Sequence, residues 1–377
     1  MAAGHDGKSD GTTYPLLPVA HVRAKVSAVA APDLSARHAF ASDNIAGAHP
    51  LVLEAVAAAN TGHAIAYGDD PWTERAAADV RRVLQAPDAE VLFTFNGTGA
   101  NVVGLASLLQ PYESVLCTRF AHILVDECGA PSRFTGSTLV PLLSSDGRLE
   151  PSQIEAQLHV VGDEHHVQPR VVSISQSTEV GTVWQPTQLA ALAEVAHGNG
   201  LYVHMDGARL ANAVAALGGD IRGAIEGVDV LTFGATKNGA LLGEAVVWLN
   251  HSLASNAKFV RKQAAQLSSK QRFIAAQFSA LLTDDLWLSL GGHANAMARR
   301  LADAVRDIPG VVLSREPEAN AIFVCIPSDT IAELQARSPF YVWDPDLGEV
   351  RWVAAWDVTE ADVDAFAADV REVLARR

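Results

Sequence analysis

The stretch Tyr202-Val-His-Met-Asp-Gly-Ala-Arg-Leu-Ala-Asn-Ala-Val-Ala-Ala216 joins an apolar strand to a helix through one acidic and one basic residue. Strand-like runs recur on both sides of it and alternate with helical stretches, a pattern typical of a parallel sheet covered by helices. The predicted strands are 91–95, 114–117, 137–141, 171–175, 202–205, 228–233 and 245–249, and the predicted helices are 50–60, 72–84, 99–109, 186–197 and 210–216. Together they indicate one large α/β domain.

The pattern changes after Asn250, where two long helical stretches, 253–282 and 285–306, are expected to connect to a small α+β domain. That domain has predicted strands at 311–314, 321–326 and 350–354, and predicted helices at 328–337 and 360–375. Residues 1–38 show no sustained period, so we interpret them as a partly disordered arm with a short helix near 22–30. The predicted division is therefore an arm at 1–38, a large domain at 39–284 and a small domain at 285–377.

Composition and charge exclude several classes of protein. The 377 residues are 49% hydrophobic and 19% charged, which excludes general disorder. Lys and Arg number 28 against 43 Asp and Glu, so the net charge of −15 disfavours nucleic acid as a partner. No apolar run approaches the ~20 residues of a membrane span, and the start of the chain lacks a secretory pattern. We therefore expect a cytoplasmic protein without a membrane partner.

Metal and disulfide sites are not expected either. The three cysteines, Cys117, Cys128 and Cys325, form no CxxC pair. The run Glu164-His-His166 lies in a polar connection without further ligands at suitable spacing, so no metal site is predicted there.

Small polar residues, Asn96-Gly-Thr-Gly99, follow the strand 91–95 and precede an apolar helix. Backbone N–H groups at a helix N-terminus bind anions, Gly97 lets a phosphate approach the backbone, and the Thr98 hydroxyl adds a donor. The spacing matches neither the GxGxxG of dinucleotide sites nor a nucleotide P-loop. Taken alone, the segment is equally consistent with an ordinary glycine turn that caps a helix.

An acid and a lysine follow two other strands. Asp206 closes the strand 202–205, where side chains commonly face a ligand crevice, although a buried ion pair between Asp206 and Arg209 is the alternative. The segment Val230-Leu-Thr-Phe-Gly-Ala-Thr-Lys-Asn-Gly239 places Lys237 in a loop of small residues. Burial lowers the pKa of a lysine and makes its amine nucleophilic. A phosphate cup, a Schiff-base lysine and an acid for a pyridine nitrogen together predict pyridoxal 5'-phosphate, with His122 placed to stack on its ring.

Several segments together resemble the low-specificity L-threonine aldolases, including the phenylserine aldolases. They are Ala41-Ser-Asp-Asn44, His63-Ala-Ile-Ala-Tyr-Gly-Asp-Asp-Pro71, Asn96-Gly-Thr98, His122, His204-Met-Asp-Gly-Ala-Arg209 and Gly234-Ala-Thr-Lys-Asn-Gly239. The resemblance covers 38–375. It implies the α/β fold of fold type I PLP-dependent transferases, with a large, mostly parallel sheet domain covered by helices on both faces and a small C-terminal α+β domain. It also implies a homo-oligomer, a dimer or a dimer of dimers, with shared active sites.

The resemblance also implies roles for individual residues. Lys237, Asp206 and His122 match the catalytic positions, respectively the Schiff-base lysine, the partner of the pyridine nitrogen and the group on the ring face. The positions that match cofactor-binding residues further include Asn96, Gly97, Thr98, Arg209 and Arg272, the last reaching the phosphate across the dimer. The positions that match substrate-binding residues are Ser42, Tyr67, Arg209 and Arg351, with Tyr67 entering the neighbour's site.

One departure concerns the general base. Many threonine aldolases carry a histidine after the fifth strand, whereas here Thr178 occupies that place. A neutral hydroxyl is a poor base, so this duty falls to His122, to a water or to the cofactor phosphate. The Thr-Glu-Val-Gly-Thr pattern that begins at Thr178 is similar to the phenylserine type and favours larger β-substituents.

The function implied is reversible retro-aldol cleavage of L-β-hydroxy-α-amino acids, such as L-threonine, L-allo-threonine or L-phenylserine, to glycine and an aldehyde. The alternative is another PLP reaction on a small-molecule amino acid, namely β-elimination, transaldolation or racemisation, because related folds use the same lysine and aspartate. A noncatalytic regulator is disfavoured by the joint presence of Lys237, Asp206 and His122.

Overall fold

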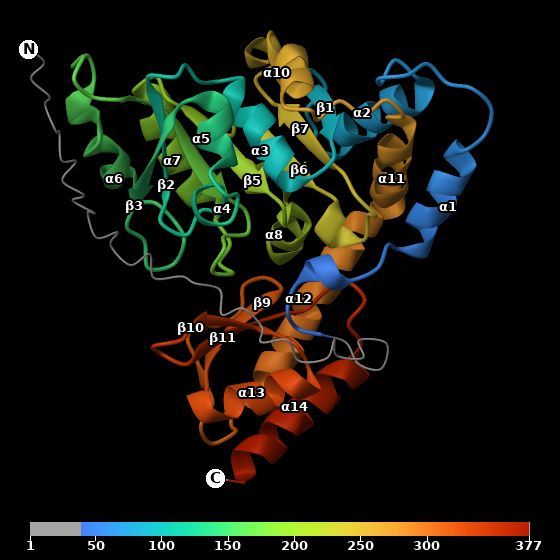
Figure 1. Ribbon diagram of the computed structural model, residues 1–377, viewed down its shortest axis with the longest axis vertical. Coiled ribbons are helices and arrows are strands. Elements are labelled where there is room, and N and C mark those ends of the chain that lie inside the picture. Colours follow the sequence, from blue (N-terminus) through green and yellow to red (C-terminus); the bar gives the residue numbers. More distant parts are fainter. Residues whose placement is uncertain (1–38, 377) are drawn as a thin grey trace, which may run out of the picture.

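A computed structural model describes residues 39–376 (Figure 1). The arm predicted at 1–38, with its short helix near 22–30, lies outside the described residues. A seven-stranded sheet of order β1-β7-β6-β5-β4-β2-β3 forms the centre of the larger body. All strands except β7 run in one direction, which confirms the prediction of a large, mostly parallel sheet. The strands are β1 (Glu90–Thr94), β2 (Glu113–Thr118), β3 (Thr138–Leu142), β4 (Gln168–Ser175), β5 (Tyr202–Gly207), β6 (Val230–Gly234) and β7 (Glu244–Trp248).

Helices cover both faces of this sheet because alternate residues of a strand point to opposite sides. Leu231 and Phe233 of β6 enter one apolar core, to which α2, α7, α8 and α11 contribute, and Val230 enters a second core with α3 and α10. The helices of this body are α1 (Pro50–Ala59), α2 (Pro71–Val83), α3 (Gly97–Ala106), α4 (His122–Val125), α5 (Ala130–Thr135), α6 (Pro151–Glu155), α7 (Pro186–Gly198), α8 (Leu210–Ala216), α9 (Ile221–Ala224), α10 (Ala257–Gln263) and α11 (Arg272–Leu282). Short 3-10 turns are η1 (Asp43–Ile45), η2 (Leu158–Val160), η3 (Thr236–Asn238), η4 (His251–Ala254) and η5 (Thr283–Asp285).

The single helix predicted at 253–282 is wrong. The chain forms η4, α10 and α11 there, with an irregular connection between Gln263 and Arg272. Ala265 adopts a left-handed backbone with φ +59°, which a continuing helix does not allow. Apolar residues recur on both sides of the interruption, so periodicity alone does not reveal it.

A four-stranded antiparallel sheet of order β10-β11-β9-β8 forms the smaller body (Figure 1). Its elements are β8 (Val312–Leu313), β9 (Ala321–Cys325), α13 (Ser328–Arg337), β10 (Tyr341–Asp344), β11 (Glu349–Val353) and α14 (Glu360–Ala375). The sequence analysis did not predict β10. Phe366 of α14 stacks on Phe40 and meets Trp352 edge-on, so the first described residues are held in this core.

Helix α12 (Leu286–Val305) links the two bodies, packing on α8 of the larger one and on α14 and β9 of the smaller one. The carboxyl ends of β4 and β5 face β9 and β11 across a small pocket. Within 39–376, no helix combines the length and the apolar character needed to cross a membrane.

Candidate active site

Asp206 lies near the end of β5 with 8% of its surface exposed. Its Oδ1 accepts the Ala208 N–H at 2.9 Å and its Oδ2 accepts the Asn101 Nδ2–H at 2.8 Å. Burial disfavours the charged form of this carboxyl. The charges of His122 and Lys237 and the hydrogen bond from Asn101 favour that form more strongly, so the pKa of Asp206 lies below its ordinary value. Asp206 is therefore an anion at neutral pH.

A chain of hydrogen bonds connects Asp206 to His122. The Asn101 amide of α3 donates to both Asp206 and Glu127, the latter at 2.7 Å, and its own oxygen accepts the Thr232 hydroxyl at 3.1 Å. Glu127 Oε1 also lies 2.8 Å from His122 Nδ1. Burial lowers the pKa of His122, yet the bond to Glu127 and the charges of Asp206 and Glu127 outweigh it, so this pKa is raised.

Asn101 and Glu127 were missed by the sequence analysis. Asn101 follows Gly97 by one helical turn on the buried face of α3, and Glu127 is a wholly buried acid five residues after His122. Glu127 Oε2 has no hydrogen-bond partner within residues 39–376. The ligand atoms of His122, Glu127 and Asp206 lie within 4.8 Å of one another, so the site concentrates negative charge around one imidazole.

Lys237 lies in η3, directly after β6. Burial lowers the pKa of its amine and Arg209 lowers it further, against partial compensation by nearby carboxylates. One of these, Glu244 on β7, accepts the Ala235 N–H at 2.7 Å, and burial raises its pKa to about 7. The lysine thus reaches its neutral, nucleophilic form at a lower pH than an exposed lysine.

Arg209 pairs with Asp43 and not with Asp206, so the alternative of an Asp206–Arg209 ion pair is wrong. Its Nε and Nη2 donate to the two Asp43 oxygens at 2.7 and 2.9 Å, and Asn320 adds a third donor at 3.1 Å. Burial opposes ionisation of Asp43, but these partners lower its pKa to about 2. Ser42, beside it, accepts the Asn44 N–H and begins η1.

Arg351 of β11 faces the same pocket from the smaller body. Burial and the charge of Arg209 lower the pKa of its guanidinium to about 10. Its Nε has no hydrogen-bond partner in the part of the chain that the structure describes, and the group lies 5.2 Å from the centre of the Trp343 ring. The pocket is lined by Ser177, Thr178, Glu179, Gly181, Arg209, Ala321, Arg351 and Val353.

The loop after β4 presents a carboxylate to this pocket. The Thr178 hydroxyl lies 2.7 Å from the Thr182 hydroxyl, within the loop. Glu179 Oε1 instead accepts the backbone N–H of His122 at 2.9 Å and the Ser175 hydroxyl at 2.6 Å. The sequence analysis named Thr178 at this place and missed Glu179, although the Thr-Glu-Val-Gly-Thr segment was the signal.

The N-terminus of α3 offers room for an anion. Asn96 caps the helix by accepting the Gly99 N–H at 2.8 Å. A Cβ on Gly97 would meet no described atom within 4 Å, whereas one on Gly99 would lie 2.2 Å from the Gln266 side chain. The open space is therefore at Gly97 and Thr98, where a helix N-terminus attracts a phosphate.

Tyr67 and Arg272 lie apart from this cluster. Tyr67 is 50% exposed, and its backbone N–H donates to Ser269 O at 3.0 Å. Arg272 Nη1 lies 3.3 Å from both Thr61 O and Gly62 O. Among the contacts of residues 39–376, neither side chain meets a residue of the Asp206 network.

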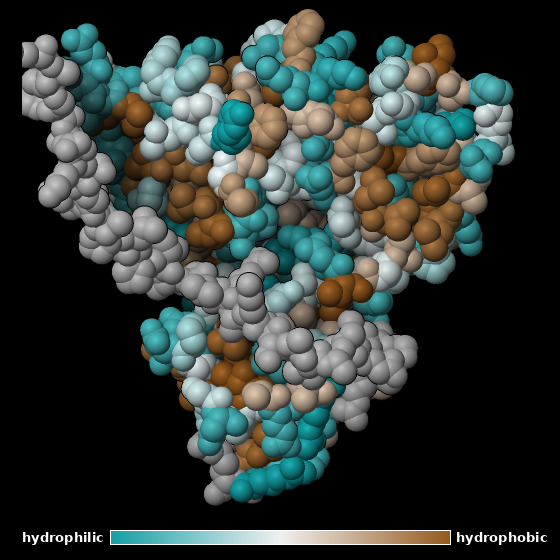
Figure 2. All heavy atoms as spheres, viewed as in Figure 1, coloured by the Kyte–Doolittle hydropathy of each residue, from teal (hydrophilic) through white to brown (hydrophobic). Residues whose placement is uncertain are grey.

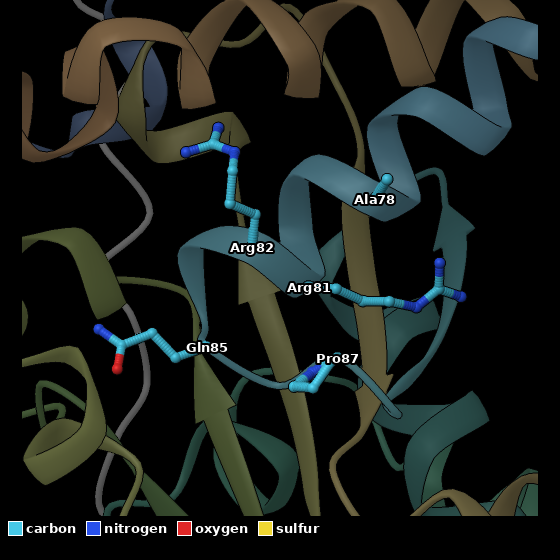
Figure 3. Close-up of a pocket in the computed structure, with 5 residues that line it drawn as sticks. All are labelled: Ala78, Arg81, Arg82, Gln85 and Pro87. Atoms are coloured by element: carbon cyan, nitrogen blue, oxygen red, sulfur yellow. The ribbon is translucent and has the colours of Figure 1, made fainter.

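A separate hollow lies at the end of α2 and is lined by Ala78, Arg81, Arg82, Gln85 and Pro87 (Figure 3). Its arginines already donate to backbone carbonyls, Arg81 to Ala89 O at 2.7 Å and Arg82 to Leu282 O at 3.0 Å. It has no acid or nucleophile among its lining residues, so the candidate active site is the pocket between the two bodies.

A lysine with a lowered pKa, an ionised aspartate and a helix N-terminus define a protein of the PLP-enzyme type, and the comparisons agree. Residues 39–328 match the model of the family described as Beta-eliminating lyase. A low specificity L-threonine aldolase of Pseudomonas aeruginosa is 45% identical over 89% of this chain and 97% of its own. A threonine aldolase structure from Leishmania major superposes with a TM-score of 0.85 at 32% identity, covering 89% of this chain and 99% of that one.

The chain therefore belongs to the beta-eliminating lyase family and, within it, to the low-specificity L-threonine aldolases. A structure of a Listeria monocytogenes protein titled as a putative L-allo-threonine aldolase, at 16% identity and a TM-score of 0.68, shares the fold.

Proposed function

We propose that this chain cleaves L-β-hydroxy-α-amino acids of the threonine and phenylserine types reversibly to glycine and an aldehyde, with pyridoxal 5'-phosphate as its cofactor. The observation that carries the proposal is that Lys237 and Asp206 lie close enough to Arg209 for their charges to interact, and that Arg209 lines one pocket together with Arg351. When bound, the cofactor supplies an electron sink for a bond at the substrate Cα.

The residues present fit this cofactor. Asp206, anionic and buried, holds a proton on a pyridine nitrogen by charge and hydrogen bonding. Lys237 offers an amine for covalent attachment that loses its proton more readily than an exposed lysine. Gly97 and Thr98 offer backbone and hydroxyl donors to the phosphate, with Asn96 fixing the helix end.

The substrate carboxylate is held by Arg351 and Arg209, with Ser42 at the edge of the site. Two guanidinium groups on one carboxylate fix the rotation about the adjacent bond, and this orients the Cα–Cβ bond for cleavage. His122, held by Glu127 through its Nδ1, is the residue that would stack on the cofactor ring. The Thr-Glu-Val-Gly-Thr segment supports substrates with larger β-substituents, because it is similar to the phenylserine type.

We also propose a homo-oligomer, a dimer or a dimer of dimers. Tyr67 and Arg272 lie away from the network of their own chain, which suits side chains that serve a neighbour's site. Figure 2 shows hydrophobic side chains gathered over α1, where Leu51 is 50% and Leu53 is 48% exposed. Sedimentation of the purified chain is expected to show a dimer or larger species, and a monomer at micromolar concentration would exclude shared sites.

The function is tested by measuring aldehyde release from L-threonine and L-phenylserine side by side, with Lys237→Ala as control. Lysine-dependent release from either substrate is expected. Release of ammonia and a keto acid in place of aldehyde and glycine would instead indicate β-elimination. Full activity of the Lys237→Ala variant would reject the assignment of the lysine.

A further inference from the structure

Glu179 is the carboxylate among the residues that line the pocket between the two bodies. It follows β4, and its Oε1 is fixed by the His122 backbone N–H and the Ser175 hydroxyl. A carboxylate has about four acceptor positions, so these bonds, together with one from its own backbone amide, leave capacity for a hydroxyl donor. The group is therefore held in place and still able to accept a proton.

Two other side chains considered for the base, Thr178 and His122, are committed elsewhere. The Thr178 hydroxyl bonds to Thr182 inside the loop. His122 Nδ1 is paired with Glu127, and the same contacts raise the pKa of the imidazole, so more of it is protonated at neutral pH. A protonated imidazole cannot take a proton.

We propose that Glu179 is the catalytic residue that accepts the β-hydroxyl proton of the substrate, an inference that rests on the proposed retro-aldol function. Arg209 and Arg351 line the same pocket, where under the proposed function they bind the substrate carboxylate. The β-hydroxyl is separated from that carboxylate by only two carbons, so a base on the same pocket wall is within its reach.

The step balances without another reactant. The hydroxyl proton moves to the Glu179 carboxylate, the O–H bonding pair becomes the second C–O bond of the aldehyde, and the Cα–Cβ pair stays with the Cα fragment. That fragment takes up one proton to become glycine. In the synthetic direction the protonated Glu179 returns its proton to the new alkoxide.

The electrostatics of Glu179 suit this role. Burial raises the pKa of its carboxyl, the hydrogen bonds from Ser175 and His122 lower it in part, and Asp206 raises it again. The charged and titratable groups that face it from neighbouring elements are His122 of α4, Asp206 and Arg209 at the end of β5, Cys117 of β2 and Arg351 of β11. A raised pKa brings a carboxylate closer to the working range of a general base.

The test compares Glu179→Gln with the parent in three measurements: aldehyde release from L-phenylserine, deuterium exchange of the glycine Cα proton, and cofactor affinity from fluorescence titration of the apoprotein. Glutamine keeps the acceptor for His122 and Ser175 but removes the base. Aldehyde release is expected to fall by roughly 10²–10⁴-fold, the usual contribution of a general base. Exchange and affinity should stay within about threefold, because neither uses the β-hydroxyl.

Glu318→Gln is the matched control, since Glu318 accepts the Val183 N–H at 2.7 Å near the same loop and does not line the pocket. It should leave all three measurements unchanged. Glu179→Asp retains a carboxylate and is expected to recover part of the cleavage rate. Its rate should fall at acid pH as that carboxylate is protonated, whereas the residual rate of Glu179→Gln should show no such fall.

Two outcomes overturn the proposal while leaving the function intact. One is a Glu179→Gln variant that releases aldehyde within about threefold of the parent. The other is a parallel loss of glycine exchange or cofactor affinity, which would reveal a structural role. A parent chain that binds the cofactor but releases no aldehyde would reject the retro-aldol function, and this inference with it.

Discussion

Removing the buried ion pair between Asp43 and Arg209 measures how much this pair contributes to the free energy of unfolding. Asp43 is 2% exposed and holds Arg209 with two hydrogen bonds. A pKa of about 2 in place of 3.8 corresponds to about 2 kcal/mol of stability at neutral pH. Asp43→Asn also leaves the Arg209 guanidinium buried without its counter-ion, which raises the expected loss to about 3–5 kcal/mol.

The pH dependence of this loss has a defined sign. The pKa of Asp43 is lower in the folded protein than in the unfolded chain, so its contribution is fully present above about pH 4 and is lost as the pH falls toward 2. The difference between parent and Asp43→Asn should therefore be constant from pH 5 to 8 and narrow below pH 4, within the range where the parent remains folded.

Urea unfolding of the apoprotein, followed by tryptophan fluorescence, measures the effect, with Asp364→Asn as the control. Asp364 holds Arg300 in the same two-bond geometry, at 3.0 and 2.9 Å, but on the exposed surface. Its loss should leave the unfolding midpoint unchanged, because water and salt screen such pairs. An Asp43→Asn midpoint as close to the parent as that of the control would refute the reasoning.

Four further substitutions probe other parts of the site. The Glu244→Gln variant should gain stability relative to the parent as the pH rises from 5 to 8, by up to about 3 kcal/mol. The pKa of the Glu244 carboxyl is about 7 in the folded protein and 4.5 in the unfolded chain, so ionisation of this group destabilises the parent above pH 4.5. A difference in unfolding midpoint that does not change with pH would contradict this. Gly97→Ala should leave the apoprotein's thermal midpoint unchanged while weakening cofactor binding, whereas Gly99→Ala should lower the midpoint because its Cβ would displace the Gln266 side chain, whose amide oxygen accepts the Phe95 N–H at 3.0 Å; equal midpoints would count against the open space at Gly97. Asn101→Ala removes hydrogen bonds to two buried carboxylates, each worth about 1.5–3 kcal/mol, and urea unfolding at neutral pH should show the loss; a midpoint equal to that of the parent would contradict this.

Residues at strand ends could be predicted from the sequence because a parallel sheet places them at one edge. Asp206 and Lys237 are such residues, and the strand bounds around them agree with the structure to within three residues. The direction of β7 could not be predicted, since an antiparallel strand buried on both faces has the same apolar character as a parallel one.

Residue pairs that come into contact only in the folded chain could not be predicted from the sequence patterns. Asp43 reaches Arg209 across 166 positions and Asn101 reaches Asp206 across 105. Polar side chains on such long-range contacts follow no local period, and the ion pair considered for Arg209 as an alternative was consequently one with Asp206, the nearest acid in sequence, and not with Asp43. Glu179 was overlooked for a different reason, because only its neighbour Thr178 was matched to the position of the expected histidine.

In the proposed function, the two arginines of the pocket contribute differently to binding of the substrate carboxylate. The charge of Arg209 is already balanced by Asp43, whose buried carboxylate stays ionised at any working pH. A substrate carboxylate must therefore share the Arg209 guanidinium with Asp43. Arg351 has a lowered pKa and an Nε without a hydrogen-bond partner within 39–376, so nearby carboxylates and the Trp343 ring compensate its desolvation only in part. The larger gain on binding a carboxylate therefore arises at Arg351, on the smaller body. Because Arg351 lies on β11 and Arg209 follows β5, a bound carboxylate also ties the two bodies together around Glu179.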